Sequence, residues 1–385
     1  MVEAVRSGRS AREVAREFRV SHATVRMWVE RASRQRLDRV QWENRPSGAR
    51  EAWNRTPREL EATVLRVRQE LRETSALGEY GAAAIAAVLR ERGEGNRPAL
   101  RTLGRILARH GAVERTMRQR WPAPPRGWYL TDVGARLAEL ESFDVVEDLK
   151  IKDGPLLHVL TGASLHGHLV SAWPEPRINA KCITAKLLEH WQEHGLPAYA
   201  QFDNDTRFQG AHHCRDTFGR VTRLCLALGV VPVFVPPRET GFQAAIENFN
   251  GQWQSKVWQR FCFESVRAVR RQSARYIEAH RQRTAARRES GPERRRWPSG
   301  FEFDVQAPLR GQIVYLRRSN GVGAVELLGR AFAVSREWLG RLVRCEVDLD
   351  QSCVRFYGLR RRDPDAHVLL REATYKPRPR RFAGE

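Results

Sequence analysis

Residues 233–257 read VFVPPRETGFQAAIENFNGQWQSKV and join a short apolar run to a proline-marked loop and a helical pattern. After the loop, apolar side chains recur every three or four residues, which is the spacing of one helix face. These side chains are Phe242, Ile246, Phe249, Trp253 and Val257. A polar row runs beside them, consisting of Gln243, Glu247, Asn250 and Gln254. The stretch predicts a buried strand, a loop and an amphipathic helix that presents the carboxylate of Glu247.

The composition favours a nucleic acid partner. The 385 residues exceed one ordinary domain of roughly 100 to 200 residues, and 67 Lys and Arg against 45 Asp and Glu give a net charge of +22. Such a charge indicates a polyanionic partner. No apolar run approaches the roughly 18 residues of a membrane span, and the first residues lack the apolar centre of a signal peptide. The six cysteines form no CxxC pair. We therefore expect a cytoplasmic protein with reduced thiols and no membrane partner.

Residues 1–40 carry the signals of two short helices. Ser10 and Glu13 form a capping box before one apolar pattern, and Ser21 is a second N-cap. The segment GRSAREVAREFRVSHATVRMWVERAS resembles the helix-turn-helix of many bacterial transposases and repressors. In that motif the second helix enters the major groove, which makes His22, Thr24 and Arg26 candidate DNA contacts. The alternative is a helical hairpin with a basic, solvated face.

Residues 56–115 predict three more helices. Thr56, Pro57 and Glu59 form a strong helix start, and further helices are expected over 82–89 and 98–108. Arginines spaced by four residues follow the outer face of the third helix, and they are Arg97, Arg101, Arg105 and Arg109. The segment resembles a homeodomain-like helix-turn-helix of insertion-sequence transposases, in which Arg97, Arg101 and Arg105 would contact phosphates. A solvated charged face is the alternative.

A linker over residues 116–140 leads into a pattern of strands. Three apolar runs between 142 and 173 fit three antiparallel strands. A helix over 179–194, a short strand ending near Asp203, a helix over 214–228 and a strand over 229–236 follow. This order is that of an α/β ribonuclease H-like fold with a mixed sheet.

Three segments of this region carry a family resemblance. The blocks FDVVEDLKI, QFDNDTRF and PPRETGFQAAIENFNGQW resemble the signatures of DDE transposases of bacterial insertion sequences, which have a retroviral-integrase-like catalytic core. The resemblance places the core at 141–262 and maps the three acids onto Asp144, Asp203 and Glu247. The intervals between them are 58 and 43 residues, and the second interval is long for the family.

The resemblance implies a metal-dependent DNA enzyme. Such an enzyme cleaves 3′ ends and transfers strands by in-line displacement at phosphorus. Two divalent ions commonly stabilise the attacking and the leaving oxygen in this reaction. Asp144, Asp203 and Glu247 would hold two Mg²⁺ or Mn²⁺ ions, since carboxylates are the ligands that Mg²⁺ prefers. The implied partners are double-stranded DNA, as element terminal repeats and target, and further copies of the chain in a homo-multimer. In a bacterium the protein would be associated with the nucleoid.

Several positions depart from the family pattern or leave alternatives open. Asp148 lies on the same side of a regular strand as Asp144 and is the alternative first acid. Asp205 stands where the family usually has glycine, and an Asp there can adopt a turn with positive φ at some cost. Gln243 replaces a usual asparagine and retains an amide, while Arg238 is a candidate for loop positioning or DNA contact. A zinc site at residues 212–214 is disfavoured because no second ligand pair accompanies it.

The remaining residues predict a basic helix and a β-domain. A helix is expected over 266–288, inside a basic segment over 263–300. Residues 305–375 alternate apolar and polar positions between turns, which fits a small SH3-like barrel resembling the C-terminal domain of integrases, and 376–385 form a basic tail. The function expected from the whole chain is that of a transposase. The alternative is a catalytically inactive or domesticated DNA-binding regulator.

Overall fold

The structure is a computed structural model. It describes residues 1–43, 56–95, 97–113, 126–211, 215–239, 241–361, 363, 366–378 and 382. Part of the predicted linker, residues 212–214 with their zinc alternative, and most of the basic tail lie outside the described residues. The chain divides into two compact units, Met1–Leu60 and Glu61–Glu385, which are considered separately.

The first unit contains short helices around a small apolar core. They are α1 (Val2–Arg6), α2 (Ala11–Glu17), α3 (His22–Ala32) and the 3₁₀ turn η1 (Leu37–Arg39). The predicted capping box is present, because Ser10 accepts a hydrogen bond from the Glu13 amide and the Glu13 carboxylate accepts one from the Ser10 amide. Ser21 caps α3 as predicted. Val14 and Val25 meet in the core between α2 and α3.

The second unit begins with a three-helix segment. Its helices are α4 (Arg58–Thr74), which starts in the first unit, α5 (Ala82–Glu91) and α6 (Leu100–Arg109). Val64, Ile85 and Leu103 are fully buried among them. Leu100 is 56% exposed because it is the first residue of α6.

The central sheet has the strand order predicted for a ribonuclease H-like core. Its first five strands are β1 (Leu140–Lys150), β2 (Leu156–Ser164), β3 (Val170–Glu175), β4 (Tyr199–Phe202) and β5 (Val231–Phe234). β1, β2 and β3 pair in antiparallel fashion. β4 runs parallel to β1, and β5 runs parallel to β4. The spatial order is therefore β3-β2-β1-β4-β5.

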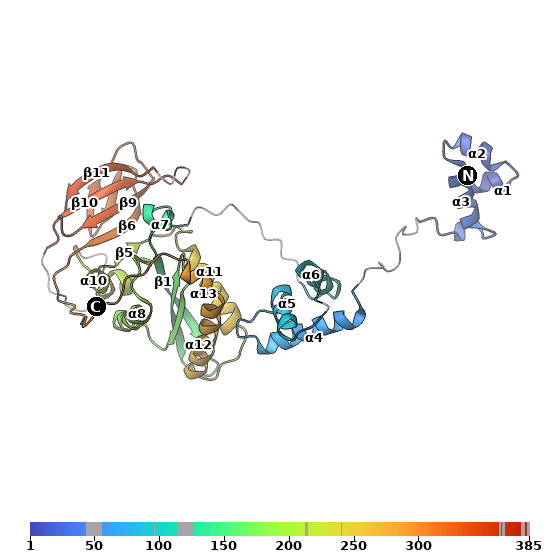
Figure 1. The fold of residues 1–385 in the computed structure, drawn as a ribbon. Coiled ribbons are helices and arrows are strands. Elements are labelled where there is room, and N and C mark those ends of the chain that lie inside the picture. Colours follow the sequence, from blue (N-terminus) through green and yellow to red (C-terminus); the bar gives the residue numbers. More distant parts are fainter. Residues whose placement is uncertain are drawn as a thin grey trace. The chain divides into compact units, whose positions relative to one another are not determined.

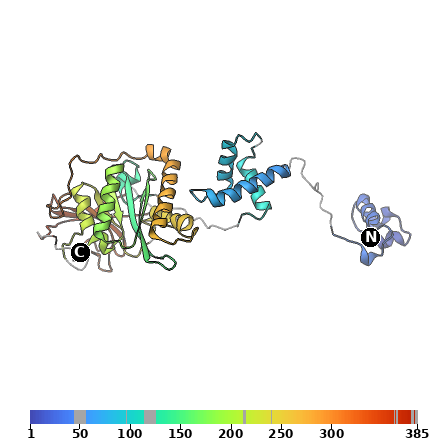
Figure 2. The same cartoon turned by 90° about the horizontal axis from the view of Figure 1, so that it is seen from below.

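Helices cover both faces of this sheet (Figures 1 and 2). One face packs against α8 (Ala180–His194) and α10 (Arg220–Ala227), with Phe143 and Trp191 fully buried between the layers. The other face packs against α11 (Ala244–Trp253), the π-helical segment η2 (Gln254–Trp258) and α12 (Val266–Arg283). All five residues of the predicted apolar stripe are buried, which confirms the orientation of α11.

Two predicted helices have different limits. The helix expected over 214–228 begins only at Arg220, after Gly219 and Gly210 approach each other so closely that a Cβ on either would clash with the other's backbone. The helix expected over 266–288 is interrupted at Thr284, and α13 (Ala285–Glu289) follows. One short helix, α7 (Thr131–Gly134), precedes β1, and another, α9 (Thr206–Gln209), follows β4.

The C-terminal strands extend the central sheet. They are β6 (Gln312–Arg318), β7 (Ala324–Leu327), β8 (Arg330–Ala333), β9 (Leu342–Asp348), β10 (Cys353–Gly358) and β11 (Val368–Thr374). β6 pairs in parallel with β5, and the order β6-β9-β10-β11 continues the sheet to nine strands, with β7–β8 as a separate hairpin.

The sequence pattern predicts that these strands form a separate barrel, whereas in the structure they are joined to the sheet of the core. Val233 pairs with Val314 and Phe234 with Tyr315, so β6 covers the edge of β5 with apolar side chains. Whether the strands close into an SH3-like barrel stays a prediction. Among the described residues, no helix is long and apolar enough to cross a membrane.

Candidate active site

Asp144 lies in β1 with its side chain on the face that α11 covers. Its Oδ2 accepts a hydrogen bond of 2.7 Å from Nδ2 of Asn250, which lies on α11. Its Oδ1 accepts a bond of 2.8 Å from the amide of Val145. Burial raises the pKa of Asp144, and these two donors offset only part of that rise.

Asp203 follows β4 immediately, beside Asp144. β4 runs parallel to β1, and their register places Asp203, directly after the carboxyl end of β4, level with Asp144 in the middle of β1. Oδ1 of Asp203 accepts a hydrogen bond of 3.0 Å from the Asp205 amide. Burial raises the pKa of Asp203 to about 6, and the neighbouring carboxylate of Asp144 adds to the rise. The two predicted acids are therefore close enough to repel each other.

Glu247 does not join this pair. It lies in the first turn of α11, one helical turn before Asn250, and its side chain is exposed. Among the described residues, no group of three His, Cys, Asp or Glu side chains is placed to hold a metal ion. The structure thus brings two of the three predicted acids together and leaves Glu247 on the same helix as the residue that contacts Asp144.

The structure separates Asp144 from its alternative, Asp148. A bulge between Val146 and Leu149 disrupts the regular alternation of β1. Asp148 lies in this bulge with φ of 57° and is exposed, so it does not share the buried environment of Asp144. Asp205 does not adopt the positive φ that an aspartate could tolerate there. Its φ is −62°, because it serves as the N-cap of α9 and accepts a hydrogen bond from the Arg207 amide.

Sequence reasoning missed the contacts that surround the two acids. Asn250, named in the sequence only as part of the polar row, is the side-chain donor to Asp144. The signal available was its place in the polar row, three residues after Glu247. Arg207 forms ion pairs with Asp205 at 2.5 Å and with Glu147 at 2.7 Å. Its positive charge lowers the pKa of both Asp144 and Asp203, against the larger effect of burial.

The two acids and Asn250 form a donor set that fits a divalent cation. Two neighbouring carboxylates supply hard oxygen ligands, and their mutual repulsion would be relieved by a positive ion between them. Oδ1 of Asn250 is buried and has no hydrogen-bond partner among the described residues. An unpaired buried oxygen beside two carboxylates is a further candidate ligand, either directly or through water.

The candidate DNA contacts are mostly exposed. His22 and Arg26 lie on the exposed side of α3, whereas the Thr24 hydroxyl is 2.7 Å from Ser21 Oγ in the helix cap. Arg97, Arg101 and Arg105 are exposed, but Arg109, the fourth of the row, pairs with the buried Glu61. Arg238 is exposed at the loop between β5 and α11, with φ of 59°.

Gln243, the family departure noted in the sequence, caps the start of α11 without a side-chain cap bond. Its Nε2 is buried and has no hydrogen-bond partner among the described residues. Among the described residues its side chain makes no hydrogen bond to Glu247, so the role expected for its amide stays a prediction.

A second buried carboxylate, Glu141, lies three residues before Asp144 in β1. It is fully buried and faces α8. Its Oε1 lies 2.7 Å from His190 Nε2, and its Oε2 accepts bonds from Trp191 Nε1 at 3.1 Å and Arg294 Nη2 at 2.8 Å. Burial raises the pKa of Glu141, but Arg294 and His190 more than offset it and hold that pKa well below its usual range.

Comparison with known proteins gives only remote likenesses. No protein-family model matches this chain, and no curated protein matches it. A solved structure of the catalytic core domain of BIV integrase is 17% identical, covers 36% of this chain and 81% of that chain, and has a TM-score of 0.29. A simian T-cell lymphotropic virus intasome in complex with PP2A regulatory subunit B56 gamma is 14% identical, covers 76% of this chain and 96% of that chain, and has a TM-score of 0.35. The strand order and pairing, rather than these scores, define the ribonuclease H-like topology of the core.

Proposed function

We propose that this chain is a DDE transposase that binds the ends of an insertion sequence, cleaves their 3′ ends and joins them to target DNA. The observation that carries the proposal is the pair of neighbouring acids, Asp144 in the middle of β1 and Asp203 directly after β4. Burial raises the pKa of both carboxylates, and the charge of Asp144 adds to the rise at Asp203. Such a pair costs stability without a ligand, which favours a cation-binding role.

The residues around the pair prepare it for that chemistry. The Asn250 amide fixes one oxygen of Asp144, and the Asp205 amide fixes one oxygen of Asp203. Asp144, Asp203 and, from α11, Glu247 would hold two Mg²⁺ or Mn²⁺ ions. When bound, such ions activate the attacking water or 3′-hydroxyl and stabilise the leaving oxygen of an in-line displacement. No covalent link between protein and DNA is needed.

The remaining parts of the chain have roles consistent with this proposal. We assign α2–α3 and α4–α6 as helix-turn-helix modules, with His22, Thr24, Arg26, Arg97, Arg101 and Arg105 as DNA contacts. Arg238, in the loop before α11, is a further proposed DNA contact. The C-terminal strands are proposed to act as a DNA-binding SH3-like domain. A charge of +22 supports binding to DNA along several surfaces. The proposed assembly is a multimer on DNA in the bacterial cytoplasm.

The test is an end-cleavage and joining assay. Purified protein with Mg²⁺ or Mn²⁺ is incubated with a labelled duplex taken from the inverted repeats that flank the gene. We expect cleavage at the 3′ end and joining to a target plasmid. Asp144→Asn, Asp203→Asn and Glu247→Gln should each reduce both reactions to background while retaining duplex binding. Asp148→Asn is the matched control and should keep activity. Strand transfer by Glu247→Gln would disprove the assignment of the third acid.

The exposed position of Glu247 favours one second candidate, a DNA-binding regulator without catalysis. In that case the acid pair would remain, but no third ligand would complete it. The same assay separates the candidates. If the protein is a regulator, the wild-type chain would bind the terminal duplex as tightly as the Asp144, Asp203 and Glu247 variants do. It would cleave no DNA with Mg²⁺ or with Mn²⁺.

A further inference from the structure

The carboxyl end of α4 is capped by side chains from the catalytic core. Arg260 donates to the carbonyl oxygens of Arg72 and Ser75, both at 2.6 Å. Arg275, on α12, donates to the carbonyl of Thr74 at 3.1 Å. The last carbonyls of a helix have no partners within it and carry partial negative charge. Cationic side chains from another part of the fold therefore satisfy the end of α4.

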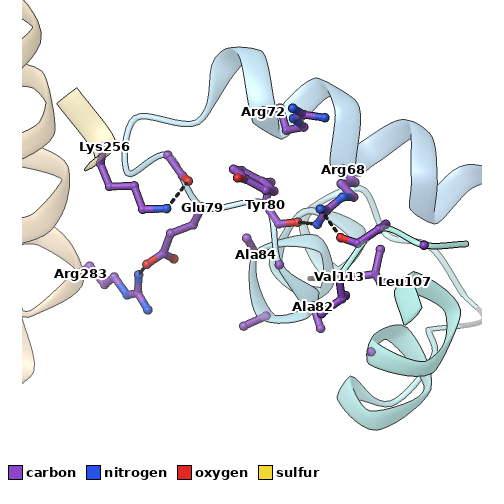
Figure 3. A pocket seen from close by; sticks show the side chains of 16 residues that line it. Arg68, Arg72, Glu79, Tyr80, Ala82, Ala84, Leu107, Val113, Lys256 and Arg283 are labelled. Atoms are coloured by element: carbon purple, nitrogen blue, oxygen red, sulfur yellow. Dashed lines mark hydrogen bonds and ion pairs between the residues drawn. The ribbon is translucent and has the colours of Figure 1, made fainter. Parts of the chain in front are cut away.

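The turn after α4 is held by the same surface (Figure 3). Lys256 Nζ donates to the Gly78 carbonyl at 3.1 Å and lies 5.6 Å from the centre of the Tyr80 ring. Arg283 forms an ion pair with Glu79. Leu77 packs against the apolar cluster of α11 and α12. The segment 72–80 thus combines an apolar anchor with several charge-assisted hydrogen bonds.

Gly78 shows how closely the two parts approach. Its φ is 60°, and a Cβ built on it would lie 3.0 Å from Lys256 Cδ and 3.1 Å from Arg260 Nη1. Beside this contact is a cleft of about 930 Å³ lined by Arg68, Arg72, Lys256 and Arg283, among others. The contact is therefore tight at the turn, while the neighbouring cleft keeps basic side chains accessible.

The contacting residues belong to the helix that reaches the acids. α11 continues without a break into η2, so Asn250, Lys256 and Arg260 follow one another along a single helical run and its terminal turn. Trp253 and Val257 are fully buried, and Trp253 Nε1 donates to Ser273 Oγ of α12 at 3.0 Å. Arg260 thus follows η2 in the turn after it, and the buried side chains of Trp253 and Val257 anchor the run that joins it to Asn250.

We infer that the cap formed by Arg260 on α4 positions the α4–α6 segment relative to α11, so that a DNA end bound by that segment is delivered to Asp144 and Asp203. Arg260 is thus a positioning residue, which touches neither the acids nor the reacting atoms. The inference rests on the proposed function in one respect, the identification of α4–α6 as a DNA-end-binding module. The π-helical segment η2 fits such a role, since π-turns within helices are frequent at functional sites.

The test compares Arg260→Ala with Arg271→Ala. Both changes remove one positive charge, but Arg271 is exposed on α12 and makes no hydrogen bond or ion pair that the described residues show. Arg260→Lys is the conservative variant, because lysine can still donate to one carbonyl. Duplex affinity is measured by fluorescence anisotropy. DNA-end position is measured by crosslinking a thiol-bearing terminal duplex to Asp148→Cys, in a chain with Cys262→Ser.

We expect Arg260→Ala to lower the crosslinking yield at least fivefold and to lower the single-turnover cleavage rate similarly, with duplex affinity within twofold of Arg271→Ala. Arg260→Lys should recover part of both. An unchanged crosslinking yield would overturn the inference, as would a loss explained entirely by weaker duplex binding. If the protein without a change at Arg260 cleaves no DNA, the proposed catalysis fails. The positioning role still stands if Arg260→Ala lowers the crosslinking yield and Arg271→Ala does not.

Discussion

Glu141 and Asp144 lie three residues apart on the same strand but in opposite environments. Glu141 faces α8, where Arg294, His190 and Trp191 satisfy both of its oxygens. Asp144 faces α11, where its side-chain donor is the neutral amide of Asn250, and its charge raises the pKa of the neighbouring Asp203. The pKa of Glu141 is lowered, whereas the pKa values of Asp144 and Asp203 are raised. Glu141 is held by ion pairs of its own, whereas Asp144 and Asp203 have no direct ion pair among the described residues and are influenced only by the charge of Arg207 nearby.

The largest expected change in stability comes from removing the charge of Glu141, which Arg294 and His190 stabilise. Glu141→Gln leaves the Arg294 guanidinium buried without its carboxylate, which should lower the free energy of unfolding by about 3 to 5 kcal/mol. Because the folded pKa of Glu141 is depressed, its stabilisation is present above the unfolded pKa and lost in acid. Denaturant titrations at neutral and acidic pH should therefore show a difference that shrinks as pH falls.

The double variant Glu141→Leu/Arg294→Leu is the control for that prediction. It removes both charges, so its cost should be well below that of the single variant. A single variant that costs less than about 1 kcal/mol would contradict the view that Glu141 depends on its ion pair.

The opposite sign is expected at Asp203. Its folded pKa of about 6 exceeds the ordinary value of 3.8, so wild-type stability should decrease as pH rises from about 4 through 6. In chelator, Asp203→Asn should raise the free energy of unfolding at pH 7.5 by on the order of 2 kcal/mol. Thermal denaturation from pH 4 to 8 measures this. Equal midpoints for variant and wild type at pH 7.5 would show that the acid pair is not under strain.

A smaller effect is expected from Asn250→Asp, which adds a third carboxylate against Asp144. In chelator it should lower the free energy of unfolding by on the order of 1 kcal/mol, because like charges would meet in a partly buried site. Adding Mg²⁺ should recover more stability in this variant than in wild type. Asn248→Asp, on the exposed side of α11, is the matched control and should respond to Mg²⁺ as wild type does.

The smallest effect is expected at Asp148. Asp148→Asn keeps a residue type that tolerates positive φ at an exposed position, so stability should change by less than about 0.5 kcal/mol. Denaturant midpoints check this value. A large loss of stability in Asp148→Asn would mean that the side chain in the bulge contributes to the stability of β1.

Patterns local in sequence were predictable here. The capping box at Ser10, the N-cap at Ser21, the apolar stripe of α11 and the order of elements along the core follow from periodicity and from residue types at helix starts. The proximity of Asp144 and Asp203 followed from the family resemblance. The bulge at Asp148 and the normal φ of Asp205 did not, because each depends on how a strand or turn meets its neighbours. Partners such as Arg294 for Glu141 are 153 residues apart in the chain, which no local pattern can reveal.

The parallel pairing of β5 with β6 sets the order in which the protein can fold as it is synthesised. Val233 finds its partner only when Val314 has been made, 81 residues later. Until then β5 is an open edge strand, and such edges pair readily with other chains. A nascent chain that stops at the end of the acid-bearing region would therefore be prone to aggregate. The C-terminal strands cover the open edge of β5. The nascent protein should therefore become fully soluble only when translation is nearly finished.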